Sequence, residues 1–179
     1  MGEEVTLVDE HDRVLGSAEK LAVHRSGQLH RAVSVFVFDR AGDMLLQQRA
    51  GTKYHSPGRW SNTCCGHPRP GEAPDDAAHR RLREEMGFDC ALNPAFAFRY
   101  RADLGKGLVE HEYDHVFVGL FTGLPRPDPD EVIGWRWASV DEIIEDLAAC
   151  PERYTAWFRI LLDQHRSRIT VPLYGRNHC

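Results

Sequence analysis

A cysteine and a histidine lie close together in the segment 60–68, which reads WSNTCCGHP. Cys65 and His67 are separated only by Gly66. A thiol and an imidazole at this spacing suit either metal binding or proton transfer. The alternative is a packed cysteine beside a loop histidine, because free cysteine often behaves as a small buried apolar residue. The segment alone leaves both interpretations open.

An acidic pair follows later in the chain, at Glu110 and Glu112, with His111 between them. If this segment leads into the strand expected from residue 113, alternation places both carboxylates on one face and the imidazole on the other. Two solvated acids before a strand would give the same pattern, since glutamate is mostly exposed.

Two more histidines, His24 and His30, are six residues apart, which is not the spacing of a helical metal pair. Gly27 lies between them and indicates a turn that could fold them together. No spacing rule alone makes them ligands.

A third group of charges lies on the helix expected from residue 74. Glu84 and Glu85 could hold a hard divalent cation, and Mg²⁺ commonly bridges carboxylate and phosphate oxygens. Equally, Arg80 with Glu84 and Arg81 with Glu85 have the spacing of ordinary ion pairs on an exposed helix.

The elements that must position these side chains form a strand-rich pattern with one early helix and two late ones, which predicts an α+β fold. Pro74 opens the early helix and Gly87 ends it as a left-handed cap. A long loop, 49–73, carries the cysteine–histidine segment, and such loops are usually functional. Strands are expected at 6–9, 33–38, 44–48, 91–100, 113–122 and 132–137, and late helices at 141–148 and 154–166.

Composition restricts the class of protein. The chain has 179 residues, of which 42% are hydrophobic and 27% charged, so disorder, collagen and a coiled coil are excluded. The net charge of −5 disfavours a general nucleic-acid binder. The longest apolar run, 32–38, is too short to span a membrane. The cysteines are odd in number and lack a repeated CxxC, which favours a reducing compartment and a cytoplasmic location: Cys64, Cys65, Cys90, Cys150 and Cys179.

The segment 66–88 resembles the Nudix box, G-x5-E-x7-R-E-U-x-E-E-x-G-U, at every position but one. Arg81 stands where that box has a metal-binding glutamate. The departure replaces a carboxylate with a cation, which weakens a multi-metal hydrolytic centre and adds a ligand for phosphate. The resemblance therefore implies a Nudix-like fold, a mixed β-sheet core between helices, and disfavours a Nudix hydrolase.

Four separated segments, taken together, are similar to one family, the type 1 isopentenyl-diphosphate isomerases. They are the EK…H…LH stretch at 19–30, the WSNTCCGHP loop, the FRYRA segment at 98–102, and the Glu110-x-Glu112 pair. The resemblance covers residues 5–169 and implies an enzyme that interconverts isopentenyl and dimethylallyl diphosphates through a tertiary carbocation.

The family's catalytic roles fall on residues of this chain. By resemblance, Cys65 lies on one face of the substrate and Glu112 on the other, while Tyr100 hydrogen-bonds the glutamate or delivers its proton. Trp157 corresponds to the aromatic residue that faces the cation, which a ring face can stabilise. Without the resemblance, Trp157 would be interpreted as a core residue of a terminal helix.

The resemblance also implies the ligands. A site for Zn²⁺ or Mn²⁺, between which the donor set does not choose, comprises His24, His30, His67, Glu110 and Glu112. Mg²⁺ at Glu85 would bridge to the diphosphate, and no flavin or nicotinamide is expected. The cations expected to hold the diphosphate are Lys20, Arg49, Lys53 and Arg81.

As a whole, the chain is expected to be one Nudix-like domain, 1–179, with the box at 66–88 and extensions at about 1–30 and 139–179. We expect a monomer that binds a small prenyl diphosphate, without nucleic-acid or membrane partners. The alternatives are a Nudix diphosphohydrolase acting on a prenyl or nucleoside diphosphate, and a silent metal-binding module. Cys64 is interpreted as structural, Glu84 stays a weak candidate ligand, and His55 and His111 receive no role.

Overall fold

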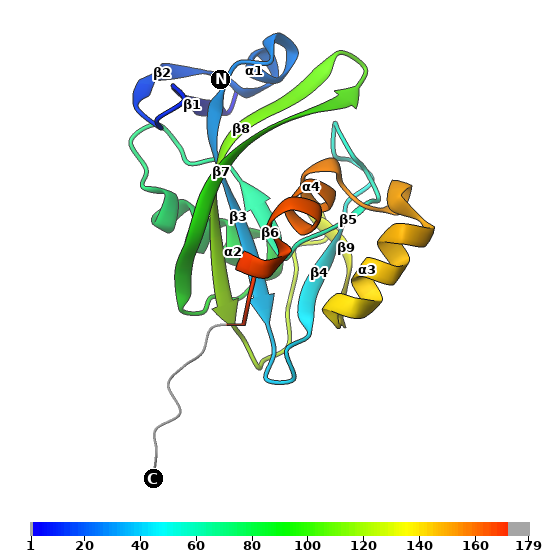
Figure 1. Ribbon diagram of the computed structural model, residues 1–179. Coiled ribbons are helices and arrows are strands. Elements are labelled where there is room, and N and C mark those ends of the chain that lie inside the picture. Colours follow the sequence, from blue (N-terminus) through cyan, green and yellow to red (C-terminus); the bar gives the residue numbers. More distant parts are fainter. Residues whose placement is uncertain (1, 172–179) are drawn as a thin grey trace.

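The central strand of the sheet is β3 (His30–Phe38), which is buried along nearly its whole length in the computed structural model (Figure 1). The structure describes residues 2–171, so Cys179 lies outside the described part. β3 pairs in parallel with β8 (Leu108–Leu120) and antiparallel with β6 (Cys64–Gly66). It also meets β1 (Glu4–Val8) and β4 (Met44–Arg49). The sheet is therefore mixed, as predicted.

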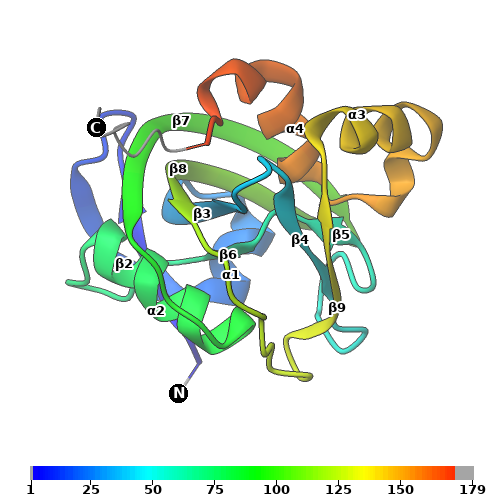
Figure 2. The same cartoon turned by 90° about the horizontal axis from the view of Figure 1, so that it is seen from below.

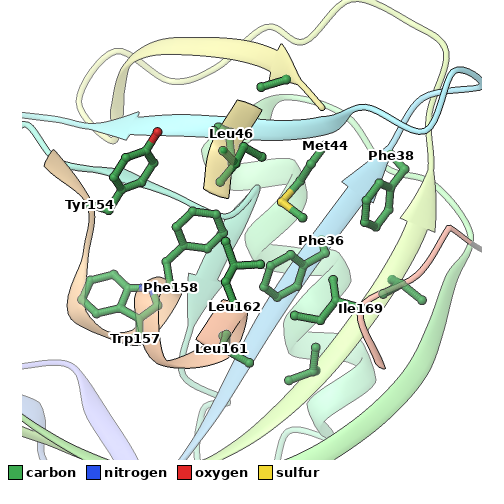
Figure 3. Packing of buried hydrophobic residues seen from close by; sticks show 14 of the residues in the cluster. Phe36, Phe38, Met44, Leu46, Tyr154, Trp157, Phe158, Leu161, Leu162 and Ile169 are labelled. Atoms are coloured by element: carbon green, nitrogen blue, oxygen red, sulfur yellow. The ribbon is translucent and has the colours of Figure 1, made fainter. Parts of the chain in front are cut away.

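The two faces of β3 belong to two separate hydrophobic clusters. Phe36 and Phe38 face the cluster beneath the C-terminal helices, which contains Phe158 and Leu161 (Figure 3). The valines of the opposite face pack under α2 (Pro74–Met86). Helices thus cover both faces of the sheet, with α2 on one side of β3 and β4 and α3 (Val140–Ala149) and α4 (Ala156–His165) on the other (Figure 2). The predicted fold class is confirmed.

The strands around Tyr100 and Glu112 are longer than predicted. β7 (Leu92–Gly105) and β8 form one hairpin that turns at Lys106 and Gly107. The expected boundaries at 100 and 113 are wrong, because the intervening charged residues continue the alternation, with one face buried against the N-terminal segment. Glu110 and Glu112 consequently lie inside β8, both buried, and not ahead of it.

The N-terminal segment contains elements that the sequence analysis does not predict, β2 (Val14–Glu19) and α1 (Lys20–Ser26). The Glu19 carboxylate caps α1 by accepting from the backbone amides of Leu21 and Ala22. Gly27 ends the helix with a φ of 67°, a left-handed conformation that favours glycine. The turn predicted at Gly27 is therefore present.

The segment 49–73, predicted as one long loop, contains two short strands. β5 (Trp60–Ser61) pairs with β4, and β6 pairs with β3. Between them, Asn62 is fully buried and donates its side-chain amide to the carbonyls of Val35 and Cys64. These bonds satisfy the buried amide and fix the segment that carries Cys65.

The C-terminal elements follow the predicted order. Gly87 ends α2 in the left-handed region at φ 69°, as expected. β9 (Val132–Ala138) pairs with β4, and Ser139 forms a capping box with Glu142 at the start of α3. α4 begins later than predicted, after the single turn η1 (Pro151–Arg153), and η2 (Arg166–Arg168) follows it. Among the described residues, no helix is long and apolar enough to cross a membrane.

Candidate active site

A buried cluster of imidazoles and carboxylates forms where α1, β3, β6 and β8 meet. Its ligand atoms all lie within 4.8 Å of one another, and every member is buried: His24, His30, His67, Glu110 and Glu112. Register explains the convergence, because His30 stands opposite Glu112 in the parallel pairing of β3 with β8. The structure therefore brings together the whole predicted metal-ligand set.

The rings of this cluster are oriented by bonds on their outer sides. Nδ1 of His24 donates to the Lys20 carbonyl at 2.7 Å, and Nδ1 of His30 donates to the Gln28 carbonyl at 2.9 Å. These bonds leave each Nε2 as a free lone pair directed into the cluster, the arrangement typical of metal-binding histidines.

The inner contacts fit a cation better than hydrogen bonding. Nε2 of His24 lies 3.0 Å from a Glu110 oxygen, yet neither atom has a hydrogen-bond partner among the described residues. Nε2 of His67, in contrast, is within hydrogen-bond distance of a Glu112 oxygen, at 3.0 Å, and of Nε2 of His30, at 3.3 Å. Lone pairs converging in this way suit a common divalent ion, and imidazole with carboxylate is a donor set for Zn²⁺ or Mn²⁺.

The members of the cluster differ in protonation. Burial would lower the pKa of His24, but the charge of Glu110 beside it raises that pKa overall. Burial lowers the pKa of His30 to about 4 and that of His67 well below its usual value, so both rings are neutral. Burial would raise the pKa of Glu110, but the nearby charge of His24, 3.0 Å away, lowers it instead. Glu112 differs, because burial and the charges of Glu110 and Asp114 raise its pKa well above the usual range.

One cavity beside the cluster is lined by all of the predicted catalytic residues: Cys65, Tyr100, Glu112 and Trp157. The Tyr100 hydroxyl donates to Glu112 at 2.6 Å, with both groups buried. Cys65 on β6 and Glu112 on β8 flank β3 from its two sides. The cavity thus has a thiol and a carboxyl–phenol pair on different walls.

The Cys65 thiol lies in a small polar network. Its Sγ donates to the Asn62 side-chain oxygen at 3.1 Å and lies 3.7 Å from the Ser34 hydroxyl. Ser34 in turn donates to the buried carboxylate of Asp114 at 2.7 Å. Burial raises the pKa of the Cys65 thiol, so the group carries its proton at neutral pH. Cys64 faces the opposite way into the α2 cluster, consistent with a structural role.

Trp157 forms an aromatic wall of the cavity. The Arg49 guanidinium lies 5.2 Å from its ring centroid, and the His55 ring meets it edge-on. The start of α4, which carries Trp157, is fixed by Thr155. The Thr155 amide donates to the Trp60 carbonyl at 2.9 Å, and the Thr155 hydroxyl is hydrogen-bonded to Ser61.

The predicted diphosphate cations line the same cavity, together with Glu85. Lys20 donates to Glu3 at 2.9 Å, and Lys53 forms an ion pair with Glu131. Arg81 pairs with Glu84 and Glu85, as the helical spacing indicates, and with Glu131 at 3.3 Å. Its stem lies against Gly66, where a Cβ would come within 2.7 Å of Arg81 Cγ. Glu84 is not among the residues that line the cavity.

Sequence reasoning missed several residues of this site. His55, left without a role, is buried with its Nε2 3.6 Å from Glu110. Glu131 precedes β9, 78 residues from Lys53, and no local spacing connects the two. Asn62 was quoted in the WSNTCCGHP loop but received no function. His111, also unassigned, bonds the Gly27 carbonyl on the outer face of β8.

Comparison with known proteins decides the family. The protein is 54% identical to "Isopentenyl-diphosphate Delta-isomerase 2" of Aromatoleum aromaticum, over 92% of this chain and 87% of that protein. It is 52% identical to "Isopentenyl-diphosphate Delta-isomerase" of Streptomyces griseus, over 91% and 83%. The chain belongs to the isopentenyl-diphosphate Delta-isomerase family. The resemblance inferred from the four segments is thereby confirmed.

The fold of this isomerase family member is shared more widely. A family profile described as "NUDIX domain" matches residues 28–158. Among solved structures, DR0079 from Deinococcus radiodurans superposes with a TM-score of 0.76 at 20% identity, covering 92% of this chain and all of the other. A MutT NUDIX hydrolase from Burkholderia pseudomallei gives a TM-score of 0.60 at 23% identity, over 77% and 98%. At these identities the likeness establishes the Nudix fold alone.

Proposed function

We propose that the protein interconverts isopentenyl and dimethylallyl diphosphates, the reaction named for its relatives, as a step of isoprenoid biosynthesis. The observation that carries this proposal is the single cavity in which a thiol, a Tyr100–Glu112 pair and an aromatic face meet a group of cations. Cleavage of a diphosphate gives no task to Cys65 or Trp157, whereas movement of a double bond uses both.

The chemistry requires that the alkene gain a proton at its terminal carbon and lose one from the carbon nearer the diphosphate. Cys65 and Glu112 divide these two transfers between them, and the reverse reaction exchanges their roles. Tyr100 hydrogen-bonds Glu112 and holds the shared proton in line with the cavity. In each turnover one group gives a proton and the other accepts one, so the number of protons on the enzyme is unchanged. The two groups have exchanged protonation states, and proton exchange with solvent restores the starting state.

The intermediate between the two transfers is a tertiary carbocation. Trp157 offers its ring face to this cation, and a ring face stabilises a charge that accepts no hydrogen bond. The buried walls around it exclude water, which would otherwise capture the cation as an alcohol.

Two metal sites complete the proposal. The cluster of His24, His30, His67, Glu110 and Glu112 would hold Zn²⁺ or Mn²⁺, and Glu85 would hold Mg²⁺ that bridges to the substrate's diphosphate. A divalent ion bound beside Glu112 supplies positive charge that increases the acidity of a proton shared there.

The remaining features concern the setting of the enzyme. We propose one domain over 1–179, with its box at 66–88, acting as a monomer in a reducing cytoplasm. The support for the reducing compartment is that Cys64, Cys65, Cys90 and Cys150 are all free thiols.

The experiment that tests the function is NMR of the metal-reconstituted protein with isopentenyl diphosphate and Mg²⁺ in D₂O. The expected result is dimethylallyl diphosphate carrying solvent deuterium, without release of phosphate. Cys65→Ala and Glu112→Gln should each abolish this signal while leaving the circular dichroism spectrum unchanged. Release of orthophosphate would indicate a diphosphohydrolase, and no change in the substrate would indicate a silent metal-binding module.

A further inference from the structure

An acid lies among the cations of the cavity, where a polyanion is expected to bind. The carboxylate of Glu131 forms an ion pair with Lys53 and lies 3.3 Å from Arg81. Its side chain is about a quarter exposed and lines the cavity together with both cations. Burial would raise the pKa of Glu131, but the charges of Lys53 and Arg81 lower it, so the group is ionised. The charges of Lys53 and Arg81 are thus already partly neutralised by the protein itself.

The backbone holds Glu131 in place independently of its carboxylate. Its carbonyl accepts from the Ala50 amide at 2.9 Å, directly after β4. Its own amide donates to the Asp128 carbonyl at 3.0 Å, and the Val132 amide donates to the same carbonyl at 2.8 Å. The turn before β9 therefore keeps its position when the side chain loses its partners. The carboxylate can be displaced without unfolding the turn.

Arg49 provides the contrast. Within residues 2–171 its guanidinium has no carboxylate partner; it donates to the His55 carbonyl at 3.3 Å, and its Nε is buried without a partner. An entering anion therefore meets a free cation at Arg49, next to Trp157, and occupied cations at Lys53 and Arg81. Lys20 is paired as well, but its partner Glu3 is more than half exposed, so that pair is the more weakly held.

We propose that Glu131 is an internal competitor for the diphosphate, an anion of the protein that occupies Lys53 and Arg81 until substrate displaces it. This inference rests on the proposed function, since it presupposes that Lys53 and Arg81 bind the substrate's diphosphate. In the free enzyme the single carboxylate partly neutralises both cations. A diphosphate displaces it, because several oxygens and more negative charge satisfy Lys53 and Arg81 together. A monophosphate or a carboxylate gains much less by the same exchange.

The exchange also has a consequence for turnover. When product leaves, Glu131 reforms its pairs with Lys53 and Arg81, so part of the cost of separating the diphosphate from these cations is recovered. A ligand that must displace an internal anion binds less tightly than the same cations alone would allow. Glu131 thus lowers the affinity of the site for the diphosphate and speeds release of the product.

A different role, direct ligation of Mg²⁺ beside Glu85, predicts the opposite sign. Removing a metal ligand weakens binding of the Mg²⁺–diphosphate complex, whereas removing a competitor strengthens it. The same substitution therefore separates the two roles.

The test compares Glu131→Gln with a matched control, Asp130→Asn, which removes a neighbouring exposed carboxylate that forms no ion pair among the described residues. Calorimetric titrations at fixed Mg²⁺ use inorganic pyrophosphate and isopentenyl monophosphate as probes. Glu131→Gln should bind pyrophosphate about five- to tenfold more tightly, in line with the loss of one half-buried charge pair. The monophosphate should gain by no more than this factor, because removing the competitor cancels at most the same displacement cost for a ligand that satisfies Lys53 and Arg81 less completely. Asp130→Asn should leave both affinities unchanged.

Unchanged or weaker pyrophosphate binding in Glu131→Gln would overturn the proposal, and weaker binding with a raised Mg²⁺ requirement would assign Glu131 to the metal instead. Glu131→Ala repeats the measurement without any hydrogen-bonding side chain, which excludes a new bond from glutamine as the cause. Because both probes bind without turnover, the outcome does not depend on isomerase activity. A protein inactive toward isopentenyl diphosphate that still shows this shift would refute the proposed function alone.

Discussion

Replacement of Tyr100 by phenylalanine tests the pairing on which proton transfer depends. The ring fits the same space, so the substitution removes only the hydroxyl that donates to Glu112 at 2.6 Å. Both side chains are 7% exposed, so water does not readily replace the lost bond. Once Glu112 has given up its proton, the Tyr100 hydroxyl donates to a charged group. Such a bond contributes about 1.5–3 kcal/mol, which corresponds to about 10- to 150-fold in kcat if the bond is made in the transition state.

The fold offers a matched control for this substitution in Tyr154. Its hydroxyl also donates to a carboxylate at 2.6 Å, that of Asp146 on α3, and neither residue lines the cavity. Tyr154→Phe should therefore lower the free energy of unfolding by about 1 kcal/mol or more and leave kcat within about twofold of wild type.

The assay is steady-state turnover of isopentenyl diphosphate combined with urea unfolding of the three proteins. Tyr100→Phe should lose kcat at nearly unchanged KM, while Tyr154→Phe should lose stability. A Tyr100→Phe kcat within twofold of wild type would refute the role of the phenol. Equal losses of kcat in both variants would trace the effect to packing and not to the proton on Glu112.

Three further predictions follow from the cavity walls. Burial raises the pKa of the Cys65 thiol, so the rate of its alkylation by iodoacetamide, measured by mass spectrometry, should rise about tenfold per pH unit from pH 7 to 9. A rate that stops rising within that range would contradict a protonated resting thiol. Gly66→Ala would place a Cβ 2.7 Å from Arg81 Cγ and push that side chain aside, so the KM for substrate should rise about tenfold with kcat largely kept; an unchanged KM would remove Arg81 from the diphosphate site. Trp157→Phe should be about tenfold more active than Trp157→Leu, because phenylalanine retains a ring face. Loss of the indole N–H should cost little, since it has no partner among the described residues. Equal rates in the two variants would show that the volume of the side chain matters and its ring face does not.

The parts of the fold that sequence predicts well are those with a local physical signal. The apolar run of β3 and the glycine that ends α2 each depend on side chains within a few residues, and both are confirmed. The same holds for the alternation at Glu110 and Glu112, although the turn of the hairpin lies well before the predicted start of the strand. Alternation predicts a face, but it does not determine where a strand ends.

Other elements exist only because of distant partners. β5 and β6 are two and three residues long and are strands only through pairing with β4 and β3, so no pattern within 49–73 reveals them. α1 has seven residues and a glutamate as its cap, which is not among the preferred N-cap residues. No local sequence pattern marks Glu131 either, because its position in the site is defined by contacts with Lys53 and Arg81, which are distant in the sequence.

The metal-ligand set was found through the resemblance, and the spacing of its members shows why. His24 and His30 come from separate elements joined by Gly27, and they meet Glu112 only through the register of β3 with β8. The residue types alone indicate that each of these side chains could bind a metal, but they do not indicate that the side chains share one site. The same limit applies to His55, which nothing in the sequence distinguishes from an ordinary loop histidine.

The attachment of the N-terminal segment has a consequence for the kinetics of metal exchange. β1 meets β3 through the single pair Leu7 and His30, whereas β8 is paired on both sides along most of its length. His24 lies on α1, and the N-terminal segment that contains α1 has less backbone pairing with the rest of the sheet than β8, which carries the two carboxylates. Local opening of α1 would uncover an ion held by the proposed ligand set while the sheet stays folded. The lifetime of the bound ion should then follow amide hydrogen exchange in α1 and not the global unfolding rate.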